Sequence, residues 1–289
     1  METNFVIMGL PASGKTTFLA ALWHLVEAEE ISCRLKLDRY EGDLTYLNRI
    51  AEAWRTFQNV PRTSQVGGDT NVTLQLVNRE TGIHGTLFFP DLAGETFDVQ
   101  VEARRCKPEF VDAVARDDGI LFFLSADVRG NALSIVELNT MLPPGAAEQT
   151  PAVVEDQNAV EAPREWEPKL VPTQVRIVQI LADLVRPPFE VRRRRLALVV
   201  SAWDLTDGMG VDPSTWLVRQ MPLVSQFLRT NDAYFDYAVY GVSAQGLSLD
   251  NTAAIDTAAQ ISPSRRIRVV GPEGEGQDLT SPLLWLMSK

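Results

Sequence analysis

The residues best suited to chemistry lie in one short stretch near the start of the chain. Residues 9–16 read Gly-Leu-Pro-Ala-Ser-Gly-Lys-Thr and match the pattern G-x-x-x-x-G-K-[ST] without a gap. An apolar strand pattern precedes this loop and an amphipathic helical pattern follows it, which argues against a chance glycine turn. Loops of this kind turn their backbone N–H groups toward phosphate oxygens at a helix N-terminus. The stretch therefore predicts a nucleotide-binding loop.

Each position in this loop has an expected task. Gly9 and Gly14 allow a close backbone approach to phosphate that a side chain would obstruct. The ammonium group of Lys15 is expected between the β- and γ-phosphates, where it also assists catalysis, and the Thr16 hydroxyl is expected to ligate Mg²⁺. The residues predicted to contact the nucleotide here are Gly9, Pro11, Ala12, Ser13, Gly14, Lys15, Thr16 and Thr17.

A second phosphate motif follows the apolar run at residues 86–89. Residues 91–94 read Asp-Leu-Ala-Gly and match D-x-x-G. Asp91 at a strand end could hold Mg²⁺ through water, and Gly94 could offer its backbone N–H to a γ-phosphate. By itself the pattern is also an ordinary strand-to-turn combination. Its place after the phosphate loop favours the functional interpretation.

These motifs are separated by alternating strand and helix patterns. Strands are predicted at residues 5–8, 72–77, 83–89, 119–125, 196–201 and 237–242. Helices are predicted at residues 16–29, 44–57, 131–142, 175–184 and 213–228. Strands that alternate with helices imply an α/β fold, with three layers and a mostly parallel sheet between helices on both faces. The two strands at residues 72–89 predict a hairpin that places one antiparallel strand at the sheet edge.

Composition limits the kind of protein and its partners. The formal net charge of −11 disfavours a general nucleic-acid binder. The basic run at residues 192–195 precedes an apolar strand, so we expect a solvated strand entrance or a site for an acidic partner. No apolar run is long enough to span a membrane, and the first strand begins too early for a leader peptide. We therefore expect a cytoplasmic protein without a membrane span.

The order of four motifs resembles the translation-factor-related class of P-loop GTPases, which contains the Ras-like proteins. The motifs are G-L-P-A-S-G-K-T at residues 9–16, D-L-A-G-E at 91–95, S-A-W-D at 201–204 and V-S-A-Q-G at 242–246. The resemblance implies one GTPase domain over residues 1–289, with bound GTP or GDP and Mg²⁺. It also implies switch loops that a partner protein reads. Residues 143–172, rich in proline and acidic residues, are expected to form a mobile insertion.

The resemblance assigns further roles that the sequence leaves partly open. Glu95 follows D-x-x-G, where the family often positions the attacking water, although a carboxylate would repel phosphate unless neutralised. The first switch would supply a threonine ligand for Mg²⁺, and both Thr63 and Thr70 qualify. Arg62 is either an internal arginine finger or an ordinary surface residue.

Base recognition is implied at two later strand ends. Asp204 stands where the family has the aspartate of [NT]-K-x-D, which accepts two N–H groups of guanine, but the family's Asn/Thr and Lys are both missing here. Asp204 could instead cap a turn, and Trp203 could pack on the base or lie in the core. Ser243, Ala244 and Gln245 resemble the family's S-A-K loop, whose backbone N–H groups meet the guanine oxygen.

Within the GTPases, the motif set looks like the bacterial double-GTPase groups, whose members are associated with conflict and defence systems. The apolar tail at residues 282–287 is expected to pack on the sheet, or else to dock a partner. Two other functions stay open from sequence, namely a P-loop ATPase or small-molecule kinase and a nucleotide-binding scaffold without hydrolysis. The leading hypothesis is a Mg²⁺-dependent GTPase switch.

Overall fold

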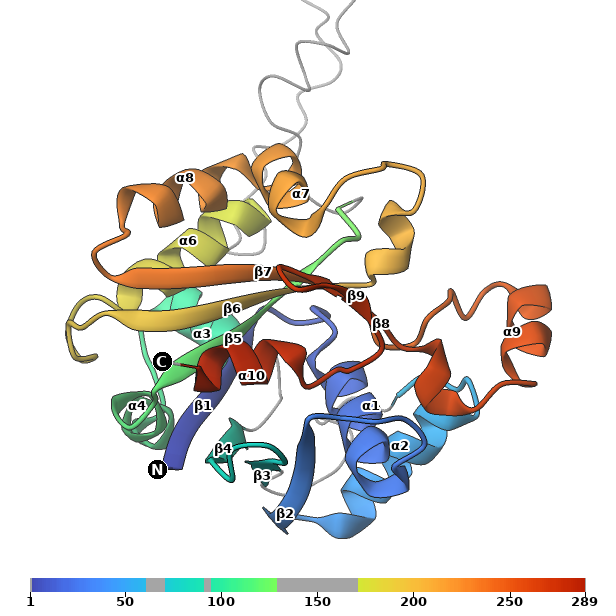
Figure 1. The fold of residues 1–289 in the computed structure, drawn as a ribbon. Coiled ribbons are helices and arrows are strands. Elements are labelled where there is room, and N and C mark those ends of the chain that lie inside the picture. The colour runs from blue at the N-terminus through green and yellow to red at the C-terminus, as the bar shows by residue number, and fades with distance from the viewer. Residues whose placement is uncertain (1, 61–70, 91–94, 129–170, 289) are drawn as a thin grey trace, which may run out of the picture.

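The computed structural model describes residues 2–60, 71–90, 95–128 and 171–288 of the chain (Figure 1). Its strands are β1 (Glu2–Gly9), β2 (Leu35–Glu41), β3 (Val72–Asn78), β4 (His84–Phe89), β5 (Gly119–Ser125), β6 (Arg194–Ser201), β7 (Phe235–Ser243), β8 (Arg268–Gly271) and β9 (Gly274–Gly276). Its α-helices are α1 (Lys15–Ala28), α2 (Leu44–Arg55), α3 (Glu95–Ala103), α4 (Pro108–Ala115), α6 (Thr173–Asp183), α7 (Pro213–Gln220), α8 (Pro222–Thr230), α9 (Thr252–Ala258) and α10 (Ser281–Met287). Two short 3₁₀-helices are η3 (Trp203–Thr206) and η4 (Pro263–Arg266).

The described strands form one mixed sheet in the order β2-β3-β4-β1-β5-β6-β7-β8-β9. The central run β4-β1-β5-β6-β7 is parallel throughout. The pairs β2-β3, β3-β4, β7-β8 and β8-β9 are antiparallel. The expectation of an α/β fold is confirmed, but the expectation of a mostly parallel sheet with one antiparallel edge strand is wrong. Antiparallel pairs flank the parallel centre on both sides, and the hairpin strand β3 lies inside the edge.

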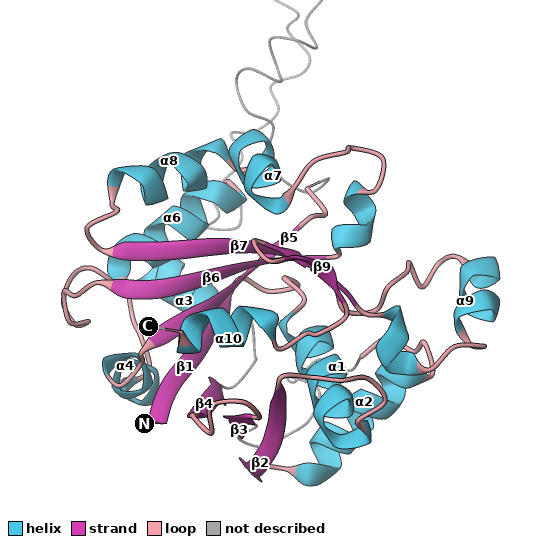
Figure 2. Ribbon diagram, in the orientation of Figure 1, coloured by secondary structure: helices cyan, strands magenta, loops and turns pink. Residues whose placement is uncertain are grey.

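Helices cover both faces of this sheet (Figure 2). On one face, α1, α2 and α10 pack on side chains such as Ile7, Leu121 and Val199. On the other, α3, α4, α6, α7 and α8 pack on alternate side chains of the same strands, including Met8, Phe122 and Val200. Because successive strand residues point to opposite faces, a strand buried on both faces is apolar throughout. All but the last residue of β5 are buried, as this argument requires.

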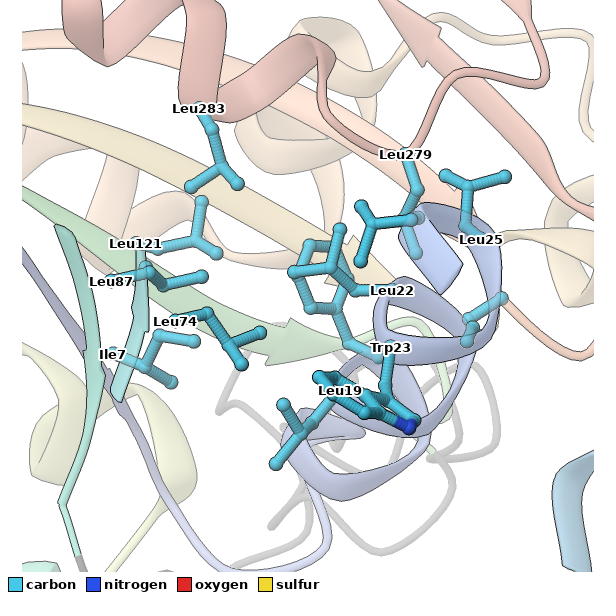
Figure 3. Close-up of a cluster of buried hydrophobic side chains, with 14 of the residues drawn as sticks. Ile7, Leu19, Leu22, Trp23, Leu25, Leu74, Leu87, Leu121, Leu279 and Leu283 are labelled. Atoms are coloured by element: carbon cyan, nitrogen blue, oxygen red, sulfur yellow. The ribbon is translucent and has the colours of Figure 1, made fainter. Parts of the chain in front are cut away.

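Helix α1 holds the phosphate loop against the sheet. Its residues Leu19, Leu22 and Leu25 lie in one apolar cluster with strand residues from β1, β3, β4 and β5 (Figure 3). Leu279 and Leu283, from the C-terminal segment, close the same cluster. Helix α2 covers α1 from outside, so α1 is buried on most of its circumference. This packing fixes the helix whose N-terminus follows residues 9–14.

Several element predictions need correction. Strand β2 was not predicted, because its charged residues leave most of it exposed at the sheet edge. The helix predicted at residues 213–228 is two helices, since Pro222 keeps the preceding Met221 out of helical geometry. The C-terminal helix α10 is buried against the sheet, so its packing prediction is confirmed. The predicted helix at residues 131–142 lies outside the described residues, as does nearly all of the insertion at residues 143–172.

The basic run at residues 192–195 is not simply a solvated entrance. The Arg194 side chain is completely buried and lies 3.5 Å from Asp117, measured from Nε to Oδ1. Its Nη1 donates to the carbonyl oxygens of Leu184 and Glu190, both at 2.9 Å. Arg192 also pairs with Asp117, and burial raises the pKa of Asp117 to about 6 although both arginines oppose this shift. Asp117 of the same chain is thus an acidic partner of this run.

Within the described ranges, no helix has the length and apolar character needed to cross a bilayer.

Candidate nucleotide-binding site

The loop between β1 and α1 has a backbone that its glycines make possible. Gly9, the last residue of β1, has φ 144°, and Gly14, directly before α1, has φ 88°. Ala12 at the exposed tip also has positive φ, at 57°. L-residues with side chains rarely adopt such angles. The predicted strand–loop–helix arrangement at residues 9–16 is therefore present.

Close packing underneath explains why two positions exclude a side chain. A Cβ atom on Gly9 would lie 2.8 Å from the carbonyl oxygen of Phe123 in β5. A Cβ atom on Gly14 would lie 2.7 Å from the Oγ of Ser201 at the end of β6. The loop thus rests directly on the ends of two neighbouring strands. Ser201 has no assigned role from sequence, and only the three-dimensional contact with Gly14 reveals it.

The start of α1 offers unused hydrogen-bond donors. The first intrahelical bond recorded at this end runs from the N–H of Phe18 to the carbonyl of Gly14, at 2.9 Å. The N–H groups of Lys15, Thr16 and Thr17 therefore lie in the turn that has no helical acceptors, and no side chain caps it. This turn contains no acidic residue. A helix N-terminus without its own anion suits an external one.

Lys15 lies inside the loop. Its Nζ donates to the carbonyl oxygens of Gly9 at 2.8 Å and Leu10 at 2.7 Å, and it lies 3.2 Å from the Oγ of Ser13. The ammonium also lies 5.8 Å from the ring centroid of Phe97 in α3. Only 5% of Lys15 is exposed, and this burial lowers its pKa to about 7. An anion bound beside the loop would favour the charged form.

Thr16 occupies the first turn of α1 and is partly exposed. A hydroxyl oxygen at this position is a suitable ligand for Mg²⁺, which prefers few protein oxygens and retains water. No group of three or more His, Cys, Asp or Glu side chains that could hold a metal occurs within the described ranges. The other predicted metal and phosphate residues, Asp91, Gly94, Thr63 and Thr70, lie outside those ranges, as does Arg62. Glu95 is the first residue of α3, and only its backbone is described.

The two strand ends predicted for base recognition come together. Asp204, in η3 after β6, donates its backbone N–H to the Oγ of Ser243 at 2.6 Å. The Ser243 hydroxyl in turn donates to Oδ1 of Asp204 at 2.6 Å. Ser243 is buried at the end of β7, while Asp204 is partly exposed. One carboxylate oxygen of Asp204 is thus held by Ser243, and this reciprocal pair fixes the direction of the carboxylate.

Trp203 belongs to the core. Only 2% of it is exposed, and its ring packs edge-on against Trp216 at 6.3 Å between centroids. A Cβ atom on Gly241 of β7 would lie 2.2 Å from the Trp203 ring, so the indole lies flat on that strand. Of the two alternatives drawn from sequence, packing on a base is therefore wrong.

Residues 243–246, here called the base loop, have a neighbour that the sequence does not indicate. The indole Nε1 of Trp54 in α2 donates to the carbonyl oxygen of Ala244 at 3.0 Å. The side chain of Gln245 donates back to the carbonyl oxygen of Trp54 at 3.3 Å. Trp54 lies far from the base loop in sequence and reads as an ordinary core residue of an amphipathic helix. No local pattern could have identified this contact.

The fold and this site define a phosphate-loop protein of the α/β class, with polar groups gathered where parallel strands end. Residues 6–286 match the model of the Double-GTPase 1 family. The chain belongs to the Double-GTPase 1 family. No curated protein sequence matches it closely enough to count as a relative.

Three matches among solved structures are to proteins described as a GTPase-like domain, as an elongation factor or as a complex with GDP. The GTPase-like domain of Ski7 from S. cerevisiae, bound to GTP, is 13% identical with a TM-score of 0.39, and the match covers 87% of this chain and 45% of that chain. The bacterial selenocysteine-specific elongation factor EF-Sec is 12% identical with a TM-score of 0.34, covering 91% and 30%. Sup35 complexed with GDP is 14% identical with a TM-score of 0.33, covering 86% and 38%. This chain spans less than half the length of each of these proteins.

Proposed function

We propose that this chain is a Mg²⁺-dependent, GTP-hydrolysing switch whose nucleotide lies across the loop at residues 9–16 and the ends of β6 and β7. The observation that carries the proposal is the buried Lys15 ammonium inside a glycine-bearing loop at the start of α1. Membership of the Double-GTPase 1 family supports guanine as the base.

In this proposal the phosphates accept hydrogen bonds from backbone N–H groups of residues 13–17. The Nζ of Lys15 keeps one carbonyl bond and turns its remaining donors to the β- and γ-phosphate oxygens, because a phosphate oxygen is a stronger acceptor than a carbonyl. Gly14 lets the loop rest on the end of β6, where Ser201 supports it from below. Thr16 and Asp91, with Thr63 or Thr70, would hold Mg²⁺. The ion supplies neutralisation of the charge that develops on the phosphate oxygens.

Hydrolysis requires an oriented water, and Glu95 is the proposed residue. It begins α3, two residues before Phe97, whose ring lies beside the Lys15 ammonium. The N-terminus of α3 is thus near the phosphate loop, and Gly94 precedes it with the proposed γ-phosphate contact. A carboxylate beside phosphate is tolerated when cations neutralise it. Loss of the γ-phosphate would release this segment, which is how such a protein would signal to a partner.

The base is proposed to lie over the ends of β6 and β7. Guanine presents two N–H donors on one edge, and the partly exposed Asp204 carboxylate accepts them in the direction fixed by Ser243. Backbone N–H groups of the base loop, at Ala244 and Gln245, would meet the guanine oxygen. Adenine carries an amino group in place of that oxygen and lacks the N–H beside it, so this arrangement would reject ATP.

Calorimetric titration with GDP, GTP and ATP in the presence of Mg²⁺ tests the proposal. We expect micromolar or tighter guanine-nucleotide binding and no ATP binding, and we expect Lys15→Ala to weaken GTP binding at least about 100-fold. The matched control is Lys36→Ala, which removes a lysine from the edge strand β2. ATP binding equal to GTP binding would refute selection of guanine and leave the ATPase or kinase alternative, and full binding by the Lys15→Ala protein would refute the proposal.

Phosphate release under single-turnover conditions tests the role of Glu95. Glu95→Gln is expected to slow hydrolysis without weakening GTP binding, because the substitution removes the carboxylate proposed to orient the water and, for binding, only relieves repulsion of the phosphate. Equal turnover in both proteins would remove Glu95 from the mechanism. The resemblance to conflict-system double-GTPases extends the proposal to defence, where cells that carry the gene should lose protection against phage when Lys15→Ala replaces the natural residue.

A further inference from the structure

Helix α2 reaches the base loop through a single buried side chain. Trp54 is completely buried one residue before the end of the helix, and its indole Nε1 donates to the Ala244 carbonyl at 3.0 Å. The Gln245 side chain returns a bond of 3.3 Å to the backbone carbonyl of Trp54. Two bonds in opposite directions therefore join α2 to two consecutive residues of the base loop.

Neighbouring side chains hold Trp54 itself in place. The guanidinium of Arg266 lies 4.9 Å from the centroid of the Trp54 ring and 4.2 Å from that of Phe57. Arg266 also donates to the carbonyl of Arg55, with both terminal nitrogens at 3.4 Å. The ring of His24 in α1 lies 5.2 Å away from the Trp54 ring. A side chain with this many contacts presents its N–H in one direction.

The other end of the base loop is fixed by the same region. Gly246 has φ +80°, and a Cβ atom there would lie 2.2 Å from the carbonyl oxygen of Arg266. The chain thus passes directly over the residue that packs on Trp54. Ser243 is held by Asp204 at the start of the loop. The peptide between Ala244 and Gln245 therefore lies between two fixed residues, Ser243 and Gly246, and its carbonyl is bound by Trp54.

The direction of the Gln245 amide follows from covalent geometry. In a trans peptide the C=O and the next N–H point in opposite directions. Because the Ala244 carbonyl points to the Trp54 indole, the Gln245 N–H points away from α2. No acceptor for this N–H is found within residues 2–60, 71–90, 95–128 and 171–288. An amide that is fixed in direction and has no acceptor of its own is suited to a ligand oxygen.

We propose that Trp54 is a positioning residue that makes the base loop select a purine with an oxygen at C6. The indole fixes the Ala244–Gln245 peptide so that its N–H meets that oxygen, whereas Asp204 separately accepts the N–H groups at N1 and C2. The inference rests on the proposed function, because it specifies how the same nucleotide site reads the base. Two parts of the site thus read different groups of one base.

Two nucleotide analogues separate these readings. In 6-thio-GDP a sulfur, which is a weak acceptor, replaces the oxygen at C6, while in IDP the amino group at C2 is missing. The preference of the protein for GDP over 6-thio-GDP measures the contact of the base loop with the C6 oxygen. Its preference for GDP over IDP measures the contact of Asp204 with the C2 amino group. Both preferences are ratios of Kd values measured by calorimetry on the full chain with Mg²⁺.

The test variant is Trp54→Phe, which keeps a buried ring and removes the indole donor. We expect the preference for GDP over 6-thio-GDP to fall about three- to tenfold while the preference for GDP over IDP is unchanged. The matched control is Trp23→Phe, because the Trp23 indole donates to Asn48 at 3.1 Å and also joins α1 to α2. The control should retain both preferences. A general loosening of α2 would change the control as well.

Gln245→Ala is the second variant, needed where Trp54→Phe does not fold. It removes the returning bond alone, and we expect a smaller change of the same ratio in the same direction. Unchanged ratios in the folded variants, or an equal fall of both ratios, would overturn the inference. A natural protein that binds no guanine nucleotide at all would overturn the proposed function first, so the two failures are distinguishable.

Discussion

The polar groups at the two ends of strand β6 differ in their exposure and in their partners. At its start, the charge of Arg194 is fully buried and is matched within the chain by Asp117 and two carbonyl oxygens. At its end, Ser201 supports a glycine loop, and the nearby Asp204 keeps a partly exposed carboxylate of which one oxygen is held by Ser243. A buried charge that the chain itself matches, as at Arg194, therefore does not mark a ligand site. The candidate site at the other end of β6 instead has polar groups that are held in direction and still reach solvent.

The largest effect is expected at the start of β6. Arg194→Met should lower the free energy of unfolding by about 3–5 kcal/mol, because two carbonyl oxygens lose their donor inside the core and Asp117 loses one of its two arginine partners. Nucleotide affinity of the remaining folded protein should be unchanged. Urea denaturation measures the first quantity and calorimetry the second. The control is Arg193→Met at the adjacent exposed position, and a loss as large in this control would contradict the comparison.

The second prediction concerns the phosphate loop. Gly14→Ala should weaken GDP binding about 100-fold, because the new Cβ would meet the Ser201 side chain at 2.7 Å in a residue with φ +88°. Gly210→Ala is matched to it, since Gly210 also has positive φ but has nothing within 4 Å of the added atom. That control should cost about 1–2 kcal/mol of stability through backbone strain and leave binding intact.

A double substitution checks the proposed steric cause. Ser201→Gly removes the atoms that the new side chain would meet, so adding it to Gly14→Ala should restore part of the lost GDP affinity. No restoration would show that the positive φ alone, rather than the contact with β6, excludes alanine.

A smaller effect is expected where Ser243 fixes Asp204. Ser243→Ala removes the hydroxyl that both accepts from and donates to Asp204, and we expect the preference for GDP over IDP to fall about tenfold. The control is Ser225→Ala, which changes another buried serine, in α8 and away from the site. If both variants lost the preference equally, the reciprocal pair would have no part in base recognition.

The smallest expected effect is a pH dependence of stability that arises from the buried Asp117. Burial raises the pKa of Asp117 from its ordinary 3.8 to about 6, so the folded protein holds this proton more tightly than the unfolded chain does. The stability gained from the protonated carboxyl group is fully present below pH 3.8 and is lost as pH rises through 6. Arg194→Met should raise this pKa further, and the variant should then lose more stability than the natural protein on the alkaline side. The deficit measured by denaturation should be about 1 kcal/mol smaller at about pH 5 than at about pH 7.5. A deficit independent of pH would mean that Asp117 keeps its charge throughout.

The parts of the molecule that sequence predicted are those set by local pattern. The loop at residues 9–16 and the bounds of β5 follow from glycine spacing and an unbroken apolar run. Strand β2 could not be predicted, because its pairing with β3 outweighs a charged, exposed composition. The burial of Arg194 depends on Asp117, which is distant in sequence, so the basic run looked solvated.

The candidate site divides in the same way. The meeting of Asp204 and Ser243 was predicted in outline, because consecutive parallel strands end at one edge of the sheet. The contacts of Ser201 with Gly14 and of Trp54 with Ala244 were not predicted, because each joins parts of the chain that are distant in sequence. Local sequence thus indicates the candidate ligand-contacting residues better than it indicates the residues that hold them in place.

The Trp203 indole, pressed flat on the backbone of β7 at Gly241, has a consequence for how the molecule changes shape. Moving the Asp204 turn would require lifting that ring out of the strand surface and away from Trp216. The Asp204 turn is therefore expected to keep one shape with and without a bound nucleotide. In a switch of the proposed kind, a change of shape between the two nucleotide forms would then arise at the other end of the site, around the loop at residues 9–16.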